Sequence, residues 1–266
     1  MNKQLKSIVN KRLAKILFVP DTHAPMHCKK SWKLMMTAMK DWKPDVICVL
    51  GDFVDFSTIS FHEQPIYKKF TLKQELNCAN QLLDQLDSLK PASAIYIGGN
   101  HDAARMDRFL AQESLRDKII PFLESGALIF NPLPNLLHLD KRGWEFVQYK
   151  DYYKLGKLYV THDVGKAGQN ANIDASNTFQ SNAVIGHTHR MSYAVTGTAR
   201  GETHVGAMFG WLGSAEAAAY AFRGRVEKDW VNGFGVGYLD KDESVYLVPV
   251  PIFKNRCMVE GKIYKL

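Results

Sequence analysis

The chain has 266 residues, of which 46% are hydrophobic and 23% charged, so it is long enough to bury a full core in one α/β domain. No apolar stretch reaches the length of a membrane span, and the basic first residues lack the apolar core of a signal peptide. We therefore expect a protein that is neither membrane-embedded nor exported. The net charge of +7 suits a polyanionic ligand, but the basic residues are spread along the chain and do not by themselves indicate nucleic acid.

The cysteines are scattered, without a Cys-x-x-Cys pair, at positions 28, 48, 78 and 257. This pattern favours unpaired thiols in a reducing compartment, which predicts a cytoplasmic protein, and it argues against a zinc–thiolate site. Residues 1–12 are basic and are predicted to form a flexible arm. No repeat or Pro/Gly/Ser-rich linker divides residues 13–266, so we expect a single domain there.

Short apolar runs at 15–19, 46–50 and 94–97 are typical of buried strands, and each ends at a polar loop. Helical spacing between them predicts one helix capped by Ser31 and a longer helix capped by Thr71. Further strands are expected at 157–160 and 183–185, followed by a strand-rich region at 192–198, 234–239 and 244–250. The chain is therefore predicted to be α/β, with two stacked sheets flanked by helices.

Potential metal ligands follow five of the predicted strands, at the edge where open α/β sheets bind their ligands. They are Asp21 and His23; Gly51, Asp52 and Asp55; Gly99, Asn100, His101 and Asp102; His162 and Asp163; and Gly186, His187, Thr188 and His189. Each piece alone could be an ordinary polar turn or surface loop. All five in order, each after an apolar run, indicate one site.

Carboxylate and imidazole ligands without thiolate favour manganese, iron, nickel, cobalt or zinc, and we expect manganese. One aspartate can bridge two ions about 3.5 to 4 Å apart. With few ligating carboxylates, the ions would keep enough positive charge to attract a phosphate and to lower the pKa of a bridging water.

The five motifs together resemble the signature of the calcineurin-like metallophosphoesterase superfamily, over about residues 15 to 190. The resemblance implies a four-layer α/β/β/α sandwich and hydrolysis of phosphate esters by a hydroxide that bridges two divalent ions. It implies one ion held by Asp21, His23, Asp52 and His189, and a second held by Asp52, Asn100, His162 and His187. It also implies that His101 is the catalytic imidazole, hydrogen-bonded to Asp55, which would orient the ring and raise its pKa.

The residues around Asp55 bear on the kind of phosphoester. Protein phosphatases of this superfamily have Arg directly after the second Asp of Gly-Asp-x-x-Asp, whereas this chain has Phe56. They also usually have Glu where this chain has Asp102, and they commonly lack the second histidine of Gly-His-Thr-His. The sequence is in these respects similar to cyclic-nucleotide phosphodiesterases and DNA-repair nucleases, which favours a phosphodiesterase or nuclease acting on nucleotides or nucleic acid.

Aromatic and basic residues near the motifs are candidates for substrate binding. Phe56 opens an aromatic segment that continues through Tyr67 to Phe70 and could stack a nucleobase, but core packing explains such a segment equally well. Arginines that could hold phosphate are Arg105, Arg108, Arg190, Arg223 and Arg225. Four histidines outside the motifs are interpreted as structural or surface residues: His27, His62, His138 and His204. The stretch 229–235 resembles the closing part of superfamily members often encoded by phages, and we expect its Trp230 in the core.

Two other functions are open alternatives. One is a phosphomonoesterase acting on phosphoprotein or a small metabolite, against which the missing arginine after Asp55 argues. The other is an inactive scaffold that binds proteins, for which intact ligands at all seven metal positions would have no purpose. The native metal, the oligomeric state and the choice between endonuclease and exonuclease do not follow from the sequence.

Overall fold

A computed structural model describes residues 2–61, 70–123, 131–214 and 229–266 of the chain. Its first sheet has six strands, in the spatial order β11 (Val245–Pro251), β10 (Gly233–Leu239), β1 (Ala14–Val19), β2 (Val46–Val49), β3 (Ser93–Ile97) and β4 (Glu145–Val147). Strands β1 to β4 are parallel to one another. Strand β10 pairs antiparallel with β1, and β11 pairs antiparallel with β10.

The second sheet has five strands, in the order β5 (Tyr153–Leu155), β6 (Leu158–Thr161), β7 (Asn182–Ile185), β9 (Thr203–Phe209) and β8 (Met191–Gly197). Strands β6, β7 and β9 are parallel, and β5 and β8 are antiparallel edges. A separate hairpin is formed by β12 (Arg256–Val259) and β13 (Lys262–Lys265). Both large sheets are therefore mixed, with a parallel centre.

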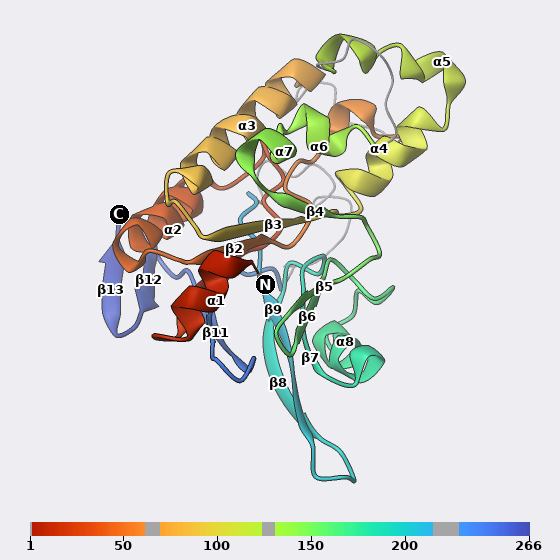
Figure 1. Ribbon diagram of the computed structural model, residues 1–266. Coiled ribbons are helices and arrows are strands. Elements are labelled where there is room, and N and C mark those ends of the chain that lie inside the picture. The colour runs from red at the N-terminus through yellow and green to blue at the C-terminus, as the bar shows by residue number, and fades with distance from the viewer. Residues whose placement is uncertain (1, 62–69, 124–130, 215–228) are drawn as a thin grey trace.

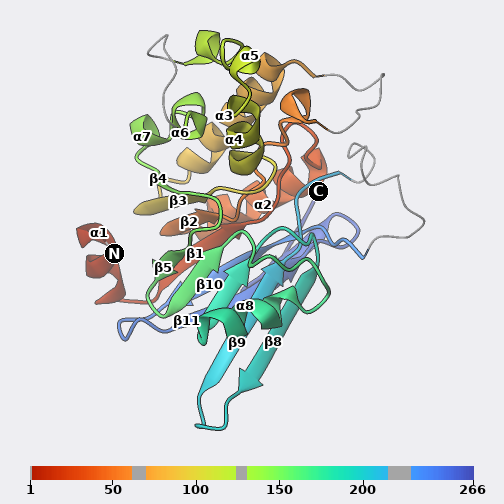
Figure 2. The same cartoon turned by 90° about the vertical axis from the view of Figure 1, so that its right-hand side faces the viewer.

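Helices lie outside the two sheets (Figures 1 and 2). The first sheet is covered by α2 (Lys29–Trp42), α3 (Leu72–Asp87), α4 (Ala103–Leu110), α6 (Leu133–Leu136) and α7 (Leu139–Arg142), with α5 (Glu113–Arg116) and the 3-10 turns η1 (Ser57–Ile59) and η2 (Ile120–Phe122) beyond them. The second sheet is covered by α8 (Ala171–Phe179). The chain thus has the predicted α/β/β/α order of layers.

Three apolar clusters hold these layers together. The cluster between the sheets includes Phe18 and Cys48 from the first sheet and Phe209 from the second, with the rings of Phe18 and Phe209 5.2 Å apart. A second cluster packs α2 and α3 on the first sheet, and a third packs α8 on the second. Strands β1 and β2 are buried on both faces, which explains why their sequences are apolar runs without alternation.

The ends of the helices test the predicted caps. Thr71 caps α3 as predicted, and its hydroxyl and the Gln74 side chain form a capping box. The prediction for Ser31 was wrong, because α2 begins at Lys29 with Cys28 at the cap position. Ser31 lies in the first turn, and its hydroxyl donates to Cys28 Sγ over 3.2 Å.

The basic amino-terminal segment, predicted as a flexible arm, contains the helix α1 (Lys3–Val9). Leu5 and Val9, four residues apart, bury their side chains in the cluster between the sheets. Asn2 caps the helix by accepting a hydrogen bond from the backbone of Leu5. Across the described parts of the chain, no helix has the length and apolar character needed to cross a bilayer.

Candidate metal centre

The predicted ligands all lie where strands end at one common edge of the two sheets. β1, β2 and β3 run parallel in the first sheet, β6 and β7 run parallel in the second, and each is followed by its motif. The loops are joined by backbone hydrogen bonds, from His23 N to Asp52 O over 2.9 Å and from Gly186 N to His162 O over 3.0 Å. Loops from distant parts of the chain are therefore held in one place.

Asp21, His23 and His189 form the first group of converging side chains, and their ligand atoms lie within 4.8 Å of one another. His189 Nε2 lies 3.0 Å from His23 Nε2 and 3.3 Å from Asp21 Oδ2. All three side chains are buried.

Asp52, His162 and His187 form a second such group, with Asn100 between the two histidines. Asn100 Oδ1 lies 2.9 Å from His162 Nε2 and 2.7 Å from His187 Nδ1. Asp52 Oδ2 lies 3.4 Å from His162 Nε2. Asp52 also groups with His23, so it stands between the two sets of ligands.

Two glycines of the motifs make this packing possible. A Cβ on Gly51, whose φ is +91°, would collide with the His162 ring, and a Cβ on Gly99 would collide with the Asp52 carboxylate. The glycines in Gly-Asp-x-x-Asp and Gly-Asn-His-Asp therefore let the loops approach each other closely.

Four of the seven predicted ligands have left-handed backbone conformations. The φ angles are 51° at His23, 48° at Asp52, 67° at His187 and 59° at His189. For a residue other than glycine this costs on the order of 1–3 kcal/mol, and such residues cluster at ligand sites. The fold holds these side chains in position against a local backbone cost.

The hydrogen-bond donors and acceptors in the cage fit a cation. His162 Nδ1 lies 2.8 Å from the carbonyl of Leu50, which can only accept, so Nδ1 carries the proton and Nε2 of the neutral ring presents a lone pair. That lone pair faces Asn100 Oδ1 and Asp52 Oδ2, which are also acceptors. In the first group His23 Nδ1 lies 2.9 Å from Asp55 Oδ1, so the same argument turns its Nε2 lone pair toward His189. Converging lone pairs of this kind are satisfied by a metal ion or by an extra proton.

The electrostatic surroundings of His162 and His189 differ. Burial disfavours the charged form of both His162 and His189. At His162 the neighbouring Asp52 outweighs burial and raises the pKa to about 10, whereas at His189 burial dominates and lowers the pKa to about 4. His162 therefore holds a proton where a cation could replace it, and His189 is neutral with its lone pair available.

His101 and Asp55, the predicted catalytic pair, lie together beside this cage. His101 Nδ1 is 2.9 Å from Asp55 Oδ1, and the His101 side chain remains 17% exposed while Asp55 is buried. Burial by itself would raise the pKa of Asp55, but the hydrogen bonds with His101 and His23 outweigh it and hold this pKa below its usual range. Asp55 is thus a carboxylate anion that orients the His101 ring.

The guanidinium of Arg105 reaches the same pair from α4. Its Nη2 lies 2.9 Å from His101 Nδ1, its Nη1 donates to the backbone oxygen of Asp55, and Nη1 is 3.6 Å from Asp55 Oδ2. With only 12% of its side chain exposed, Arg105 is directed at protein groups and supports His101 in this arrangement.

The other two predicted substrate contacts are placed differently. Phe56 is fully buried in the cluster under α2 and α3, so its ring has no face for a substrate and we correct its interpretation to a core residue. Arg190 lies near the site, where its Nε donates to Asp229 over 2.6 Å and its Nη1 to the Ala167 carbonyl over 3.0 Å. The candidates His62, Tyr67, Arg223 and Arg225 lie outside the described residues.

Two tryptophans that the motifs did not reveal pack against His189. The Trp211 ring stacks on the His189 ring with centroids 4.6 Å apart and an interplanar angle of 12°, and Trp230 meets His189 edge-on at 4.5 Å. Trp230 was predicted in the core, yet it is only partly buried and belongs to this aromatic wall. Trp211 follows β9 directly after Gly210, and this glycine at a strand end was the available signal.

Ring contacts with Trp211 and Trp230 take the place of a hydrogen bond that metal-binding histidines usually make. Such histidines normally donate their second ring nitrogen to a carboxylate or carbonyl. His189 Nδ1 is buried and has no hydrogen-bond partner within the described parts of the chain. The orientation of this ring therefore rests on stacking.

Asp102 is buried, and its carboxylate accepts hydrogen bonds from three backbone N–H groups. Its Oδ1 accepts from Gly99 N and Ala103 N over 2.6 Å each, and its Oδ2 accepts from Phe53 N over 3.0 Å and from the Tyr96 hydroxyl over 2.7 Å. It caps α4 and connects the second and third motif loops, so it holds these two loops together without facing the proposed ions.

Comparison with known proteins gives a family and several distant relatives. The family model of the calcineurin-like phosphoesterases matches residues 14–239. The Gene 54 proteins of Mycobacterium phages L5 and D29 are similar at 22% and 24% identity, each over 95% of this chain and 99% of the relative. Among solved structures, Vacuolar Protein Sorting 29 from Cryptosporidium parvum aligns over 95% of both chains with 13% identity and a TM-score of 0.46.

Proposed function

Because the chain belongs to the calcineurin-like phosphoesterase family, we propose that it hydrolyses phosphodiester bonds in nucleotides or nucleic acid with the aid of two divalent metal ions. One ion would be held by Asp21, His23, Asp52 and His189, and the other by Asp52, Asn100, His162 and His187. The observation that carries this proposal is the convergence of lone pairs at the strand ends, which leaves two groups of ligand atoms with Asp52 between them.

Manganese is the metal we propose, because oxygen and imidazole ligands without thiolate suit it, and iron, zinc, nickel and cobalt share that preference in part. When bound, such a pair of ions supplies positive charge for the phosphate and lowers the pKa of water.

The protein groups beside the ligands supply proton transfer and orientation. His101 Nδ1 contacts both Asp55 and Arg105, and we assign the donation of a proton to the departing oxygen to the other ring nitrogen, Nε2. Its ring also lies within 4.8 Å of the ligand atoms of His23 and Asp52, next to the place where a phosphate would bind. General acid catalysis by such a positioned histidine contributes about 10²- to 10⁴-fold.

Among the described residues, the placement of the arginines favours a diester over a monoester. A monoester carries one more negative charge and gains more from a guanidinium clamp, but the position after Asp55 is the buried Phe56. Arg105 is held by His101 and Asp55, and Arg190 by Asp229 and Ala167. Neither arginine is aimed at the ligands in this arrangement, which suits a substrate with a single negative charge.

We also propose that the protein works in the cytoplasm. Its four cysteines are unpaired, and Cys48 and Cys257 are buried, as expected of thiols that a reducing compartment keeps reduced.

A parallel rate comparison tests the proposed activity. Bis-p-nitrophenyl phosphate, p-nitrophenyl phosphate and single-stranded DNA are incubated with the protein and manganese, and we expect the two diesters to be hydrolysed faster. A preference for the monoester would replace the diesterase by a phosphatase. If no substrate is hydrolysed with manganese, iron, zinc, nickel or cobalt, the proposed enzymatic activity is refuted. The alternative of an inactive protein-binding scaffold would then be favoured.

A further inference from the structure

A strip of aromatic and basic side chains begins beside the candidate metal centre. At its near end the Tyr149 ring lies 6.1 Å from the ring of His162, and Lys150 Nζ lies 5.7 Å above Tyr149. These two residues lie on the connection between β4 and β5, which is tied to the end of β6 by a hydrogen bond from the Thr161 hydroxyl to the Asp151 carbonyl over 2.8 Å. The near end of the strip is therefore fixed next to the cage.

At the far end of the strip three rings hold one another in place. Tyr159 on β6 and Phe179 at the end of α8 stack with centroids 4.7 Å apart and 13° between their planes. Tyr152 packs against both, at 5.2 Å from Tyr159 and 5.4 Å from Phe179, and Lys154 Nζ lies 5.4 Å from the Tyr159 ring. Tyr152 is 54% exposed although it is braced by two rings.

Phe179 also packs on the apolar cluster under α8, whereas Tyr152 belongs to none of the three apolar clusters. A large ring that is both exposed and held by its neighbours loses little conformational freedom when a ligand stacks on it. Tyr152 is three positions after Tyr149 in the sequence, so their Cα atoms are at most about 11 Å apart. The two rings therefore lie on one short connection, and the Tyr149 ring is the one beside His162.

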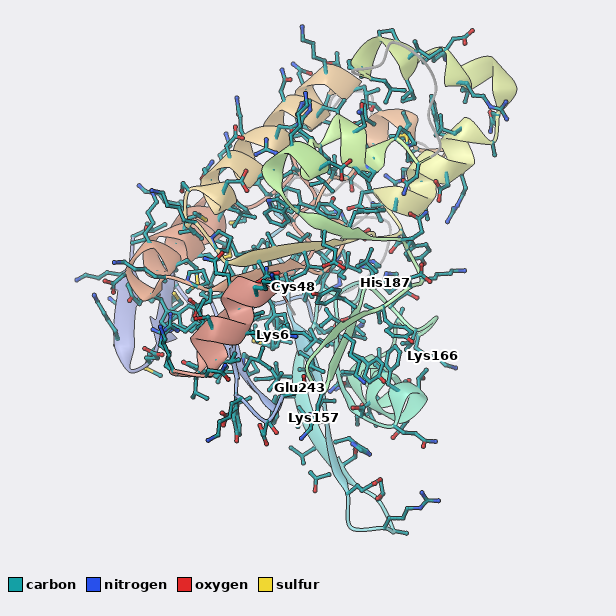
Figure 3. All side chains as sticks on the ribbon, in the orientation of Figure 1. Lys6, Cys48, Lys157, Lys166, His187 and Glu243 are labelled. Carbon is teal, nitrogen blue, oxygen red and sulfur yellow. The ribbon has the colours of Figure 1, made fainter. Side chains whose placement is uncertain are left out.

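The charges along the strip attract an anion. Within residues 149–154, Lys150 and Lys154 are exposed, against one exposed carboxylate, Asp151. Lys166, on the loop between β6 and α8, lies on the same side of the molecule as His187 in Figure 3. Aromatic rings that alternate with cations are the features with which proteins bind single-stranded nucleic acid without sequence preference, by stacking on bases and contacting phosphates.

We propose that the residues Tyr149, Lys150, Tyr152, Lys154, Tyr159 and Phe179, which we call the aromatic strip, bind single-stranded nucleic acid and guide it to the metal centre. This inference rests on the proposed diesterase function and specifies its substrate as a polymer. Tyr152 offers its exposed ring to a base, Tyr159 and Phe179 support that ring, and the lysines face the backbone phosphates.

Fluorescence anisotropy with a short fluorescein-labelled oligothymidylate, in EDTA and at low salt, tests binding without cleavage. Tyr152→Ala is expected to weaken binding about 5- to 150-fold, because one base stack is worth about 1 to 3 kcal/mol. Tyr152→Phe keeps the ring and should bind like the wild type. Lys154→Gln should lower the slope of log affinity against log salt by about 0.7, as expected for one lost phosphate contact on a single strand.

Matched controls come from residues outside the strip. Tyr246 on β11 of the first sheet is 57% exposed and Lys254 is exposed, and neither belongs to the aromatic strip, so Tyr246→Ala and Lys254→Gln should leave binding unchanged. All of these variants should hydrolyse bis-p-nitrophenyl phosphate at the wild-type rate with manganese, because none of the substituted residues belongs to the candidate metal centre.

The outcomes separate this inference from the proposed function. The wild-type protein could hydrolyse the small diester and fail to bind the oligonucleotide, or the Tyr152→Ala variant could bind it as well as the wild type. Either result would refute binding by the aromatic strip and would leave the proposed diesterase activity intact. Binding that depends on Tyr152, in a protein that hydrolyses no phosphoester, supports the strip and refutes the diesterase.

Discussion

Asp55 Oδ1 lies 2.9 Å from Nδ1 of His23, a proposed metal ligand, and the same oxygen lies 2.9 Å from Nδ1 of His101. The predicted role of Asp55 was to orient His101 alone. The structure gives it a second contact, in which it holds the proton of His23 on Nδ1 and so turns the Nε2 lone pair toward Asp21 and His189. One carboxylate thus connects the ligand cage to the proton donor.

Asp55→Ala should therefore reduce metal binding as well as turnover. Loss of the hydrogen bond that orients a ligating histidine typically costs about 10- to 100-fold in metal affinity. We expect this loss in a calorimetric titration with manganese, together with a fall in kcat. Unchanged affinity for both ions would show that His23 does not depend on Asp55.

His101→Ala should have the opposite profile. His101 is not among the proposed ligands, so both ions should remain, while kcat falls about 10²- to 10⁴-fold with the loss of the general acid. Metal content measured on the purified protein, alongside the rate, distinguishes the two variants. Loss of metal with a normal rate per remaining holoenzyme would contradict the assigned role.

Arg105→Gln tests whether a guanidinium positions His101. The substitution removes the contact from Nη2 to His101 Nδ1 and the donation to the Asp55 carbonyl. We expect a lower kcat at nearly constant KM, because the arginine acts through His101. A raised KM at constant kcat would instead mean that Arg105 binds the substrate directly.

Trp211→Leu should weaken one metal position and spare the other. His189 Nδ1 has no hydrogen-bond partner in the described parts of the chain, so the stacked Trp211 ring orients this ligand. We expect the titration to change from two comparable ions to one retained and one weakened ion, and Trp211→Phe to restore much of the loss.

Trp144→Leu is the matched control for this prediction, since Trp144 is equally buried but bonds to Asp87 away from the cage. Both leucine variants should lose thermal stability. Only the change at Trp211 should alter metal stoichiometry, and a similar change in both would reduce the effect to general destabilisation.

Removal of metal should lower the unfolding temperature. A cation that binds the converging lone pairs of the folded protein stabilises the native state, and a ligand at about 100 times its Kd does so by about 2.7 kcal/mol. Unfolding followed by circular dichroism should therefore shift upward when manganese is added after EDTA. An identical transition with and without the metal would argue against binding to the native state.

Local chemistry in the sequence was sufficient to predict the layers and the motif loops. Short apolar runs such as Val46–Val49 are typical of strands buried on both faces, and a parallel sheet brings their carboxyl ends to one edge. The cap at Thr71 was also readable, because a capping box is made within four residues. These features depend on neighbours along the chain or on the direction of strands.

Other features depend on contacts between distant segments, which no local pattern encodes. From the sequence, the aromatic segment after Asp55 fits a core position and a substrate-binding surface equally well. The structure places Phe56 of this segment in the core, because α2 and α3 pack over its ring. Trp211 and Trp230 became part of the centre because β9 ends beside β7, and the second contact of Asp55 exists because the loops after β1 and β2 are bonded together. The sequence by itself determined which side chains could bind metal, and the tertiary structure decided which residues orient them, because orientation is set by packing across elements.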